Sequence, residues 1–300
     1  MDAGLYRDFV GVDPSGVLLN HAEQNGLIVR RGLLGVEEFL GTQFPSEEVL
    51  EELESGVKGK LLALTGMGNV SGVRVWLCSD VVSAASRVTQ RGVVFEPVDS
   101  PRVPYRRGEL YGYISVVEGL SGRYRPELDC TRKACVVDAS LATGVRRYPR
   151  IEGEFLVFSL LDRWLYTPGG SGVVFVSDGF PDPPECNAPS PLILAYLWGV
   201  LSYLESIGYG EVERRVLGLS GEYGWLLDRA GYTPLTPPEE SFRAGVLSVS
   251  LPLPAGEIGV VKRRLLEKGV RVGFVRKIMR LSPSFYNEPG DIDLVLRVLP

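Results

Sequence analysis

The sequence predicts an α/β protein with a three-layer large domain and a smaller α+β domain at its C-terminal end. Short runs of Val, Ile, Leu and Phe recur along the first two-thirds of the chain, and many are continuous, as in strands that helices cover on both faces. From Phe242 onward, strand and helix patterns describe a compact unit of their own. At 300 residues and 32.9 kDa, the chain is long enough for two packed domains. We expect an N-terminal segment (1–30), a large α/β domain (31–180), a hinge with long connecting helices (181–235) and a small domain (236–300).

The large domain begins with a predicted helix over Phe44–Ser55, with Ser46 as its N-cap. The run KLLALT at Lys60–Thr65 is interpreted as a short buried strand, followed by a glycine-rich loop over Thr65–Gly72. Further apolar runs predict the remaining strands of this domain: Val73–Cys78, Gly92–Val98, Leu110–Val117, Ala134–Val137, Phe155–Phe158 and Gly172–Val176.

A proline-rich segment, Asp178–Pro191, ends the large domain and precedes the longest apolar run of the chain, PLILAYLWGVLSYL. This run is shorter than the about twenty residues that span a membrane, so it predicts a buried helix with Ser190 as N-cap. A second helix is expected near Glu211–Leu219. The small domain then continues as strand, helix, two strands and a closing helix: Ala244–Leu253, Gly256–Gly269, Val270–Val275, Lys277–Pro283 and Asp291–Leu299.

The charge balance argues against nucleic-acid binding. The net charge is −5 and the pI is about 5.2, whereas nucleic-acid binding needs a concentrated basic surface. Local arginine clusters are interpreted as solvated faces or structural ion pairs: Arg106/Arg107, Arg123/Arg125 and Arg146/Arg147/Arg150. The first residues lack the order of a signal peptide, so we expect a cytoplasmic protein with no membrane partner.

The cysteines and histidine argue against a metal site. The four cysteines form no CxxC pair, and the chain has one histidine, His21. A reducing cytoplasm fits this pattern best. Arginine greatly outnumbers the six lysines, which hints at a heat-adapted source, or at one with GC-rich DNA.

Four segments carry a resemblance to a known family. ACVVDASLATGV puts Asp138 after a buried strand, at the sheet edge where open α/β folds bind ligands. The second segment is FLVFSLLDRWLYTPGGSGVVFV, and the others are LLNHAEQNGL near the N-terminus and MRLSPSFYNEPGDIDLVLRVL near the C-terminus. Together, in this order, they resemble the class V aminotransferases, the pyridoxal-phosphate (PLP) family that includes cysteine desulfurases, kynureninase and the isopenicillin N epimerase group.

This resemblance implies a role for several residues. Asp138 matches the carboxylate that keeps the pyridine ring of PLP protonated, and Ser159 matches a phosphate-binding serine. Arg280 matches the arginine that binds the substrate carboxylate. The remaining implied contacts are backbone amides toward the phosphate and side chains at the substrate side: Gly66, Gly68, Asn69, Asn20 and His21.

The sequence departs from the family at the residue that should hold the cofactor. Arg163, preceded by Asp162, stands where the family has the Schiff-base lysine. An arginine remains protonated and cannot form the imine, so covalent attachment of PLP is lost. Lys133, the closest lysine upstream, precedes the strand that leads to Asp138. We expect Asp162 and Arg163 to form an internal ion pair in the former cofactor cleft.

Three functional hypotheses follow. The first is a catalytically degenerate homologue that retains the fold as a binding or subunit-interaction module. The second is a PLP-dependent aminotransferase or carbon–sulfur lyase that acts on an amino acid with non-standard cofactor attachment. The third is a binder of a small phosphate or carboxylate metabolite that uses Arg163, Arg280 and the loop Thr65–Gly72. The resemblance implies a homodimer, and a heteromeric partner stays open.

Overall fold

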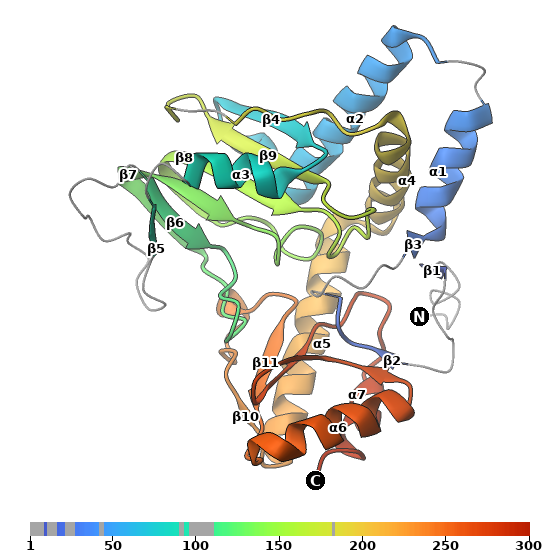
Figure 1. Cartoon of the computed structure of the whole chain (residues 1–300), viewed down its shortest axis with the longest axis vertical. Coiled ribbons are helices and arrows are strands. Elements are labelled where there is room, and N and C mark those ends of the chain that lie inside the picture. The colour runs from blue at the N-terminus through green and yellow to red at the C-terminus, as the bar shows by residue number, and fades with distance from the viewer. Residues whose placement is uncertain are drawn as a thin grey trace.

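The computed structural model describes residues 9–10, 17–21, 28–41, 45–89, 93–95, 111–181 and 184–300. Its centre is a six-stranded sheet (Figure 1). In spatial order, the strands are β4 (Val73–Cys78), β9 (Gly172–Ser177), β8 (Arg150–Leu160), β7 (Glu127–Asp138), β6 (Tyr111–Ser115) and β5 (Val93–Phe95). The sequence predicted all six strands. The rest of the strand expected over Gly92–Val98 and the cluster Arg106/Arg107 lie outside the described residues.

Strand direction decides which loops can share a site. β5, β6, β7 and β8 run parallel, whereas β9 is antiparallel to both β8 and β4, so β4 runs in the same direction as β8. Gly172 pairs with Cys78 on one side and with Leu160 on the other. The carboxyl ends of β4, β6, β7 and β8 therefore meet at one edge of the sheet.

Helices cover both faces of this sheet, as the continuous apolar strands predicted. α3 (Val81–Thr89) packs on one face through Val81, Ala84 and Ala85. α2 (Glu47–Thr65) and α4 (Pro191–Ile207) bury their apolar residues against the other face. The large domain is thus a three-layer α/β structure.

α2 corrects one sequence prediction, because Lys60–Thr65 is the last part of this helix and not a strand. Ser46 is its N-cap, as predicted, and accepts a hydrogen bond from Val49 N at 3.4 Å. The helix continues past Ser55 because Val57, Leu61 and Leu64 recur at helical spacing and are buried. A short apolar run such as KLLALT carries no period of its own, so the sequence alone fits both a strand and the end of a helix.

α1 (Arg30–Gly41) lies against α4, and glycines allow the close approach. A Cβ on Gly35 would lie 2.4 Å from Ala195 O. α4 turns into α5 (Tyr209–Arg229), which is longer than the helix predicted over Glu211–Leu219. Of the described helices none is individually long and apolar enough to span a membrane, and only α4 and α5 reach that length together, with a bend of 78°.

The C-terminal part has its own sheet and core. β10 (Thr233–Pro234), β11 (Leu247–Ser250), β14 (Ile278–Leu281) and β13 (Gly273–Val275) form an antiparallel sheet in this order. α6 (Ala255–Glu267) and α7 (Asp291–Leu296) contribute Val261, Leu265, Ile292 and Val295 to the core beside it. Further short strands are β1 (Phe9–Val10) with β3 (Ile28–Val29), and β2 (Val17–Leu18) with β12 (Val270–Arg271).

The four cysteines form two disulfides, which the sequence analysis did not predict. Cys78, the last residue of β4, pairs with Cys186, 108 residues later. Cys130 pairs with Cys135 across the irregularity in β7, where its register with β8 shifts. Cys78 and Cys186 are brought together only by the folded sheet, because they are 108 residues apart.

His21 joins three parts of the chain. Its Nδ1 lies 2.8 Å from the Tyr166 hydroxyl and its Nε2 lies 2.7 Å from the Tyr286 hydroxyl. Trp164 stacks on its ring at 6.2 Å between centroids. Tyr166 follows β8 in the large domain, whereas Tyr286 belongs to the C-terminal segment. The side chain of His21 is completely buried, and burial lowers its pKa to about 3.

This burial predicts a pH-dependent stability. The unfolded chain binds a proton at His21 below a pH of about 6.5, whereas the folded chain does not until about pH 3, so stability falls as pH falls through this window. We expect the unfolding free energy at pH 5.5 to be about 1 kcal/mol below its value at pH 7. Urea denaturation at the two pH values measures it, and His21→Gln serves as control. An equal pH dependence in the variant would contradict the assignment.

Candidate functional site

Asp138 lies at the carboxyl end of β7, at the sheet edge that the sequence predicted. Both oxygens of its carboxylate accept hydrogen bonds. The Tyr113 hydroxyl donates to Oδ2 at 3.1 Å, and Ser140 N donates to Oδ1 at 2.9 Å. Burial raises the pKa of Tyr113, and the charge of Asp138 raises it further, so the hydroxyl stays protonated and donates. Each oxygen of the carboxylate therefore already has one donor within the protein.

The N-terminus of α3 lies at the same edge, directly after β4. The sequence did not indicate this feature, because the resemblance puts the amides that face the phosphate at Gly66, Gly68 and Asn69. Helix N-termini bind anions because their first N–H groups lack partners. Here Val81 N donates to Gly170 O at 3.2 Å, and Ser83 N donates to the Asp80 carboxylate at 3.0 Å. An acidic side chain thus occupies the position at which an anion would bind.

Asp162 and Arg163 lie in the turn between β8 and β9. Arg163 Nε is 3.7 Å from Asp162 Oδ1, so the expected ion pair is present. Burial raises the pKa of Asp162, and the neighbouring guanidinium opposes this shift. The turn is held by Trp164, which is buried and donates from Nε1 to Leu141 O at 3.2 Å. Arg163 therefore sits on a fixed turn beside a partly buried carboxylate.

Ser159 lies near Asp138 in sequence register but on the other face of the sheet. Phe158 pairs with Asp138, and successive side chains of a strand point to opposite faces. Phe158 packs with α3, whereas the neighbouring Val157 packs in the core under α2 and α4. Ser159 is completely buried, and its hydroxyl donates to Leu160 O at 3.1 Å.

The loop with Gly66, Gly68 and Asn69 lies at the opposite edge of the sheet from Asp138. It follows α2 and precedes the amino end of β4. Tyr148 N, which precedes the amino end of β8, donates to Thr65 O at 2.9 Å. Gly66 has φ 78° and serves as the C-cap of α2. The structure does not bring this loop together with Asp138 or Arg163.

Asn20, His21 and Arg280 come together in the C-terminal half of the molecule. Asn20 forms an isolated β-bridge with Ser282. Ser282 directly follows β14, the strand that contains Arg280. The Oδ1 atom of Asn20 is buried and has no hydrogen-bond partner among the described residues. Arg280 is 9% exposed. The contact of His21 with Trp164 and Tyr166 links this group to the turn that carries Arg163.

These observations test whether PLP fits the chain. The turn after β8 offers a guanidinium instead of an amine, the Asp138 carboxylate is bound by Tyr113, and the α3 N-terminus is capped by Asp80. Lys133 lies five residues before Asp138 on β7, about 16 Å along an extended strand. The residues present therefore do not fit covalently bound PLP. In the described part of the chain, no group of His, Cys, Asp and Glu side chains has the arrangement of a metal site.

No protein-family model and no curated protein matches this sequence. Solved structures, in contrast, match over nearly the whole chain. Apo cysteine desulfurase from Thermococcus onnurineus NA1 aligns with a TM-score of 0.71 and 13% identity, covering 94% of this chain and 93% of its own. Phosphoserine aminotransferase from Cytophaga hutchinsonii aligns with a TM-score of 0.67 and 11% identity, covering 95% and 98%.

A third similar structure is a C-DES variant with glycine covalently linked to its PLP cofactor. It aligns with a TM-score of 0.74 and 14% identity, covering 95% of this chain and 96% of its own. Identities this low establish the fold and leave the activity open. The chain has the class V aminotransferase-like fold of PLP-dependent transferases, as the four sequence segments predicted.

Proposed function

We propose that this chain is a catalytically degenerate relative of the PLP-dependent transferases that serves as a binding or subunit-interaction module. The observation that carries the proposal is Arg163, paired with Asp162, in the turn where the resemblance expects the Schiff-base lysine. A guanidinium neither forms an imine nor shuttles protons at neutral pH. The central chemical step of the family therefore has no group to perform it.

Two further changes at the same edge support this proposal. Tyr113 uses the Asp138 oxygen that would otherwise be available to a ring nitrogen. Asp80 adds a negative charge at the N-terminus of α3, where a phosphate would need positive potential. Arg163 thus disfavours attachment of the cofactor aldehyde, Tyr113 disfavours binding of the ring nitrogen, and Asp80 disfavours binding of the phosphate.

The two alternatives receive less support. A PLP enzyme with non-standard attachment needs an amine near Asp138, and the nearest lysine on β7 is Lys133. A binder of a phosphate or carboxylate metabolite that combines Arg163, Arg280 and the loop at Gly66 needs groups from both edges of the sheet.

We further propose that the protein works in the cytoplasm of a heat-adapted organism. Arginine predominates over lysine in the sequence, and all four cysteines are paired. Intracellular proteins of hyperthermophiles are an exception to the rule that cytoplasmic proteins lack disulfides. The two properties are compatible in such an organism.

Absorbance spectroscopy with PLP tests the degenerate state directly. We expect no stoichiometric imine at a single site when purified protein is mixed with PLP, and only substoichiometric labelling of exposed lysines after borohydride reduction and denaturation. The reason is that the Arg163 side chain remains a protonated guanidinium. A stoichiometric imine at one lysine, located by mass spectrometry, would contradict the proposal.

Substitutions test how much Arg163, Asp80 and Tyr113 each contribute to the loss of imine formation. Arg163→Lys alone is expected to form little imine, because Asp80 still opposes the phosphate and Tyr113 still occupies Asp138. Adding Asp80→Ser, which retains an N-cap without the charge, together with Tyr113→Phe, is expected to raise imine formation at least tenfold over Arg163→Lys. Borohydride trapping and mass spectrometry measure the yield. Equal yields in the single and triple variants would show that Asp80 and Tyr113 do not matter.

The proposed subunit interaction is a homodimer. Exposed apolar side chains gather on three helices that pack together, α1, α2 and α4: Leu34, Leu40, Val49, Leu192 and Trp198. Exposed apolar residues on neighbouring helices favour a protein interface. We expect light scattering after gel filtration to give twice the monomer mass of 32.9 kDa. Leu40→Glu should shift the protein toward monomer, while Leu266→Glu on α6 serves as control. A strict monomer at all concentrations would contradict the homodimer.

A further inference from the structure

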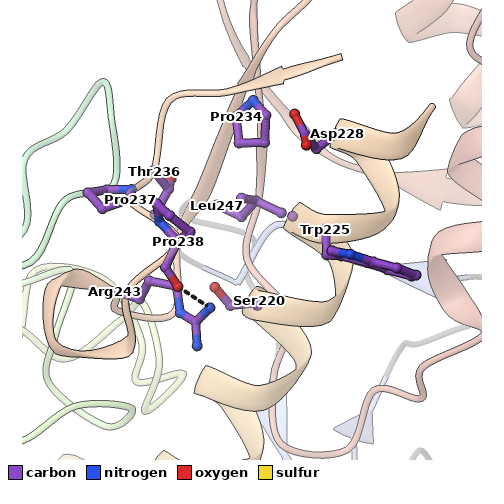
Figure 2. Close-up of a pocket in the computed structure, with 11 residues that line it drawn as sticks. Ser220, Trp225, Asp228, Pro234, Thr236, Pro237, Pro238, Arg243 and Leu247 are labelled. Atoms are coloured by element: carbon purple, nitrogen blue, oxygen red, sulfur yellow. Dashed lines mark hydrogen bonds between the residues drawn. The ribbon is translucent and has the colours of Figure 1, made fainter. Parts of the chain in front are cut away.

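A pocket of about 420 Å³ lies in the small domain, separate from the Asp138 edge. Figure 2 shows it between the second half of α5 and the segment that runs from Pro234 to Arg243. β11 contributes Leu247. The indole of Trp225 points away from the other labelled side chains. Polar groups lie at both ends of the pocket, and apolar groups lie between them.

Arg243 forms one end of the pocket. Its guanidinium lies against α5 because Gly221 has no side chain, and a Cβ there would be 2.4 Å from Nη1. Nη1 donates to Pro238 O at 2.9 Å. Nη2 is 3.9 Å from the Glu240 carboxylate, which is longer than a hydrogen bond, and buried Nε has no acceptor among the described residues.

The Nε and Nη2 atoms form the edge with which an arginine binds a carboxylate in a bidentate manner. On Arg243, this edge is not satisfied by the protein. A largely buried cation without a closely bonded anion is unfavourable, so an anion that reaches it would be stabilised. Burial also lowers the pKa of Arg243, as expected for a cation that lacks a close partner.

Ser220 provides a second unsatisfied group at the same end. Its side chain is completely buried, and Oγ has no hydrogen-bond partner among the described residues. Figure 2 shows it beside the Arg243 guanidinium. A carboxylate bound by Arg243 would therefore find a hydroxyl donor nearby.

Asp228 forms the other end. Ser220, Gly224 and Asp228 follow one another at four-residue spacing, so they lie on one face of α5. The Asp228 carboxylate is exposed and takes part in no ion pair within the described ranges. The Arg243 guanidinium lies beside Gly221, and the helix rises about 10 Å from Gly221 to Asp228. An ion-pair contact of up to about 4 Å at each end leaves room for one small zwitterion between the two charges. Pro234 and Leu247 provide apolar contacts between the charges (Figure 2).

We propose that this pocket binds a free amino acid with an apolar side chain. Arg243 holds the carboxylate, Asp228 holds the ammonium group, and Pro234 and Leu247 contact the side chain. Gly224 lines the pocket and lets α5 lie close to Leu247, since a Cβ there would be 3.3 Å from Leu247 Cδ1. The site shares no residue with the Asp138 edge, so it does not depend on whether the chain is catalytic.

Isothermal titration calorimetry of the full chain tests this proposal with three probes. They are L-leucine, 4-methylpentanoate, which lacks the ammonium group, and 3-methylbutylamine, which lacks the carboxylate. We expect L-leucine to bind at least tenfold more tightly than either analogue, because only the zwitterion satisfies both charged ends. Equal affinity for L-leucine and an analogue, or no binding of L-leucine at millimolar concentration, would overturn the proposal.

Variants locate the binding in this pocket. Arg243→Gln should weaken L-leucine binding at least tenfold, and Gly224→Leu should abolish it by filling the space. Asp228→Asn should weaken binding of L-leucine but leave that of 4-methylpentanoate within twofold. Arg229→Gln and Glu222→Gln, on other faces of α5, are matched controls that should change little, and thermal melting verifies folding. Unchanged L-leucine affinity in folded Gly224→Leu would overturn the assignment.

Discussion

The hydrogen bond from the Tyr113 hydroxyl to the Asp138 carboxylate is the interaction on which this account depends. In an open α/β sheet, a carboxylate at the end of a central parallel strand faces the ligand. Asp138 has this position because β6, β7 and β8 run in the same direction. Once Tyr113 donates to it and Ser140 N donates to its other oxygen, the carboxylate stabilises the protein instead.

Other polar groups near Asp138 also bond to partners within the protein. Asp80 and Gly170 O take the free N–H groups of α3, and Arg163 pairs with Asp162. At Asp138 and at the N-terminus of α3, the groups that a ligand would need are therefore bonded within the protein. In the pocket of the small domain, the buried Nε atom of Arg243 and the Ser220 hydroxyl have no hydrogen-bond partner among the described residues. These two atoms make the pocket of the small domain a candidate ligand site that is separate from the Asp138 edge.

Much of the fold was predictable because its strands are continuous apolar runs and its motifs are local. The sequence located Asp138, the Arg163 turn and the long helix after Ser190, since each depends on neighbours within a few residues. It misassigned Lys60–Thr65, because a six-residue apolar run fits both a strand and the end of a helix. It also could not decide which edge of the sheet the Gly66 loop occupies, because this depends on the direction of β4.

The sequence also did not predict the contact of Tyr113 with Asp138, since the two residues are 25 positions apart and meet only through strand pairing.

A crystal structure of the protein grown with excess PLP would show directly whether Tyr113 keeps the Asp138 carboxylate from binding the cofactor. We expect the Tyr113 hydroxyl to remain within hydrogen-bond distance of the Asp138 carboxylate, with no cofactor density beside it. A pyridine ring nitrogen bound to Asp138, with the Tyr113 side chain displaced, would contradict the account.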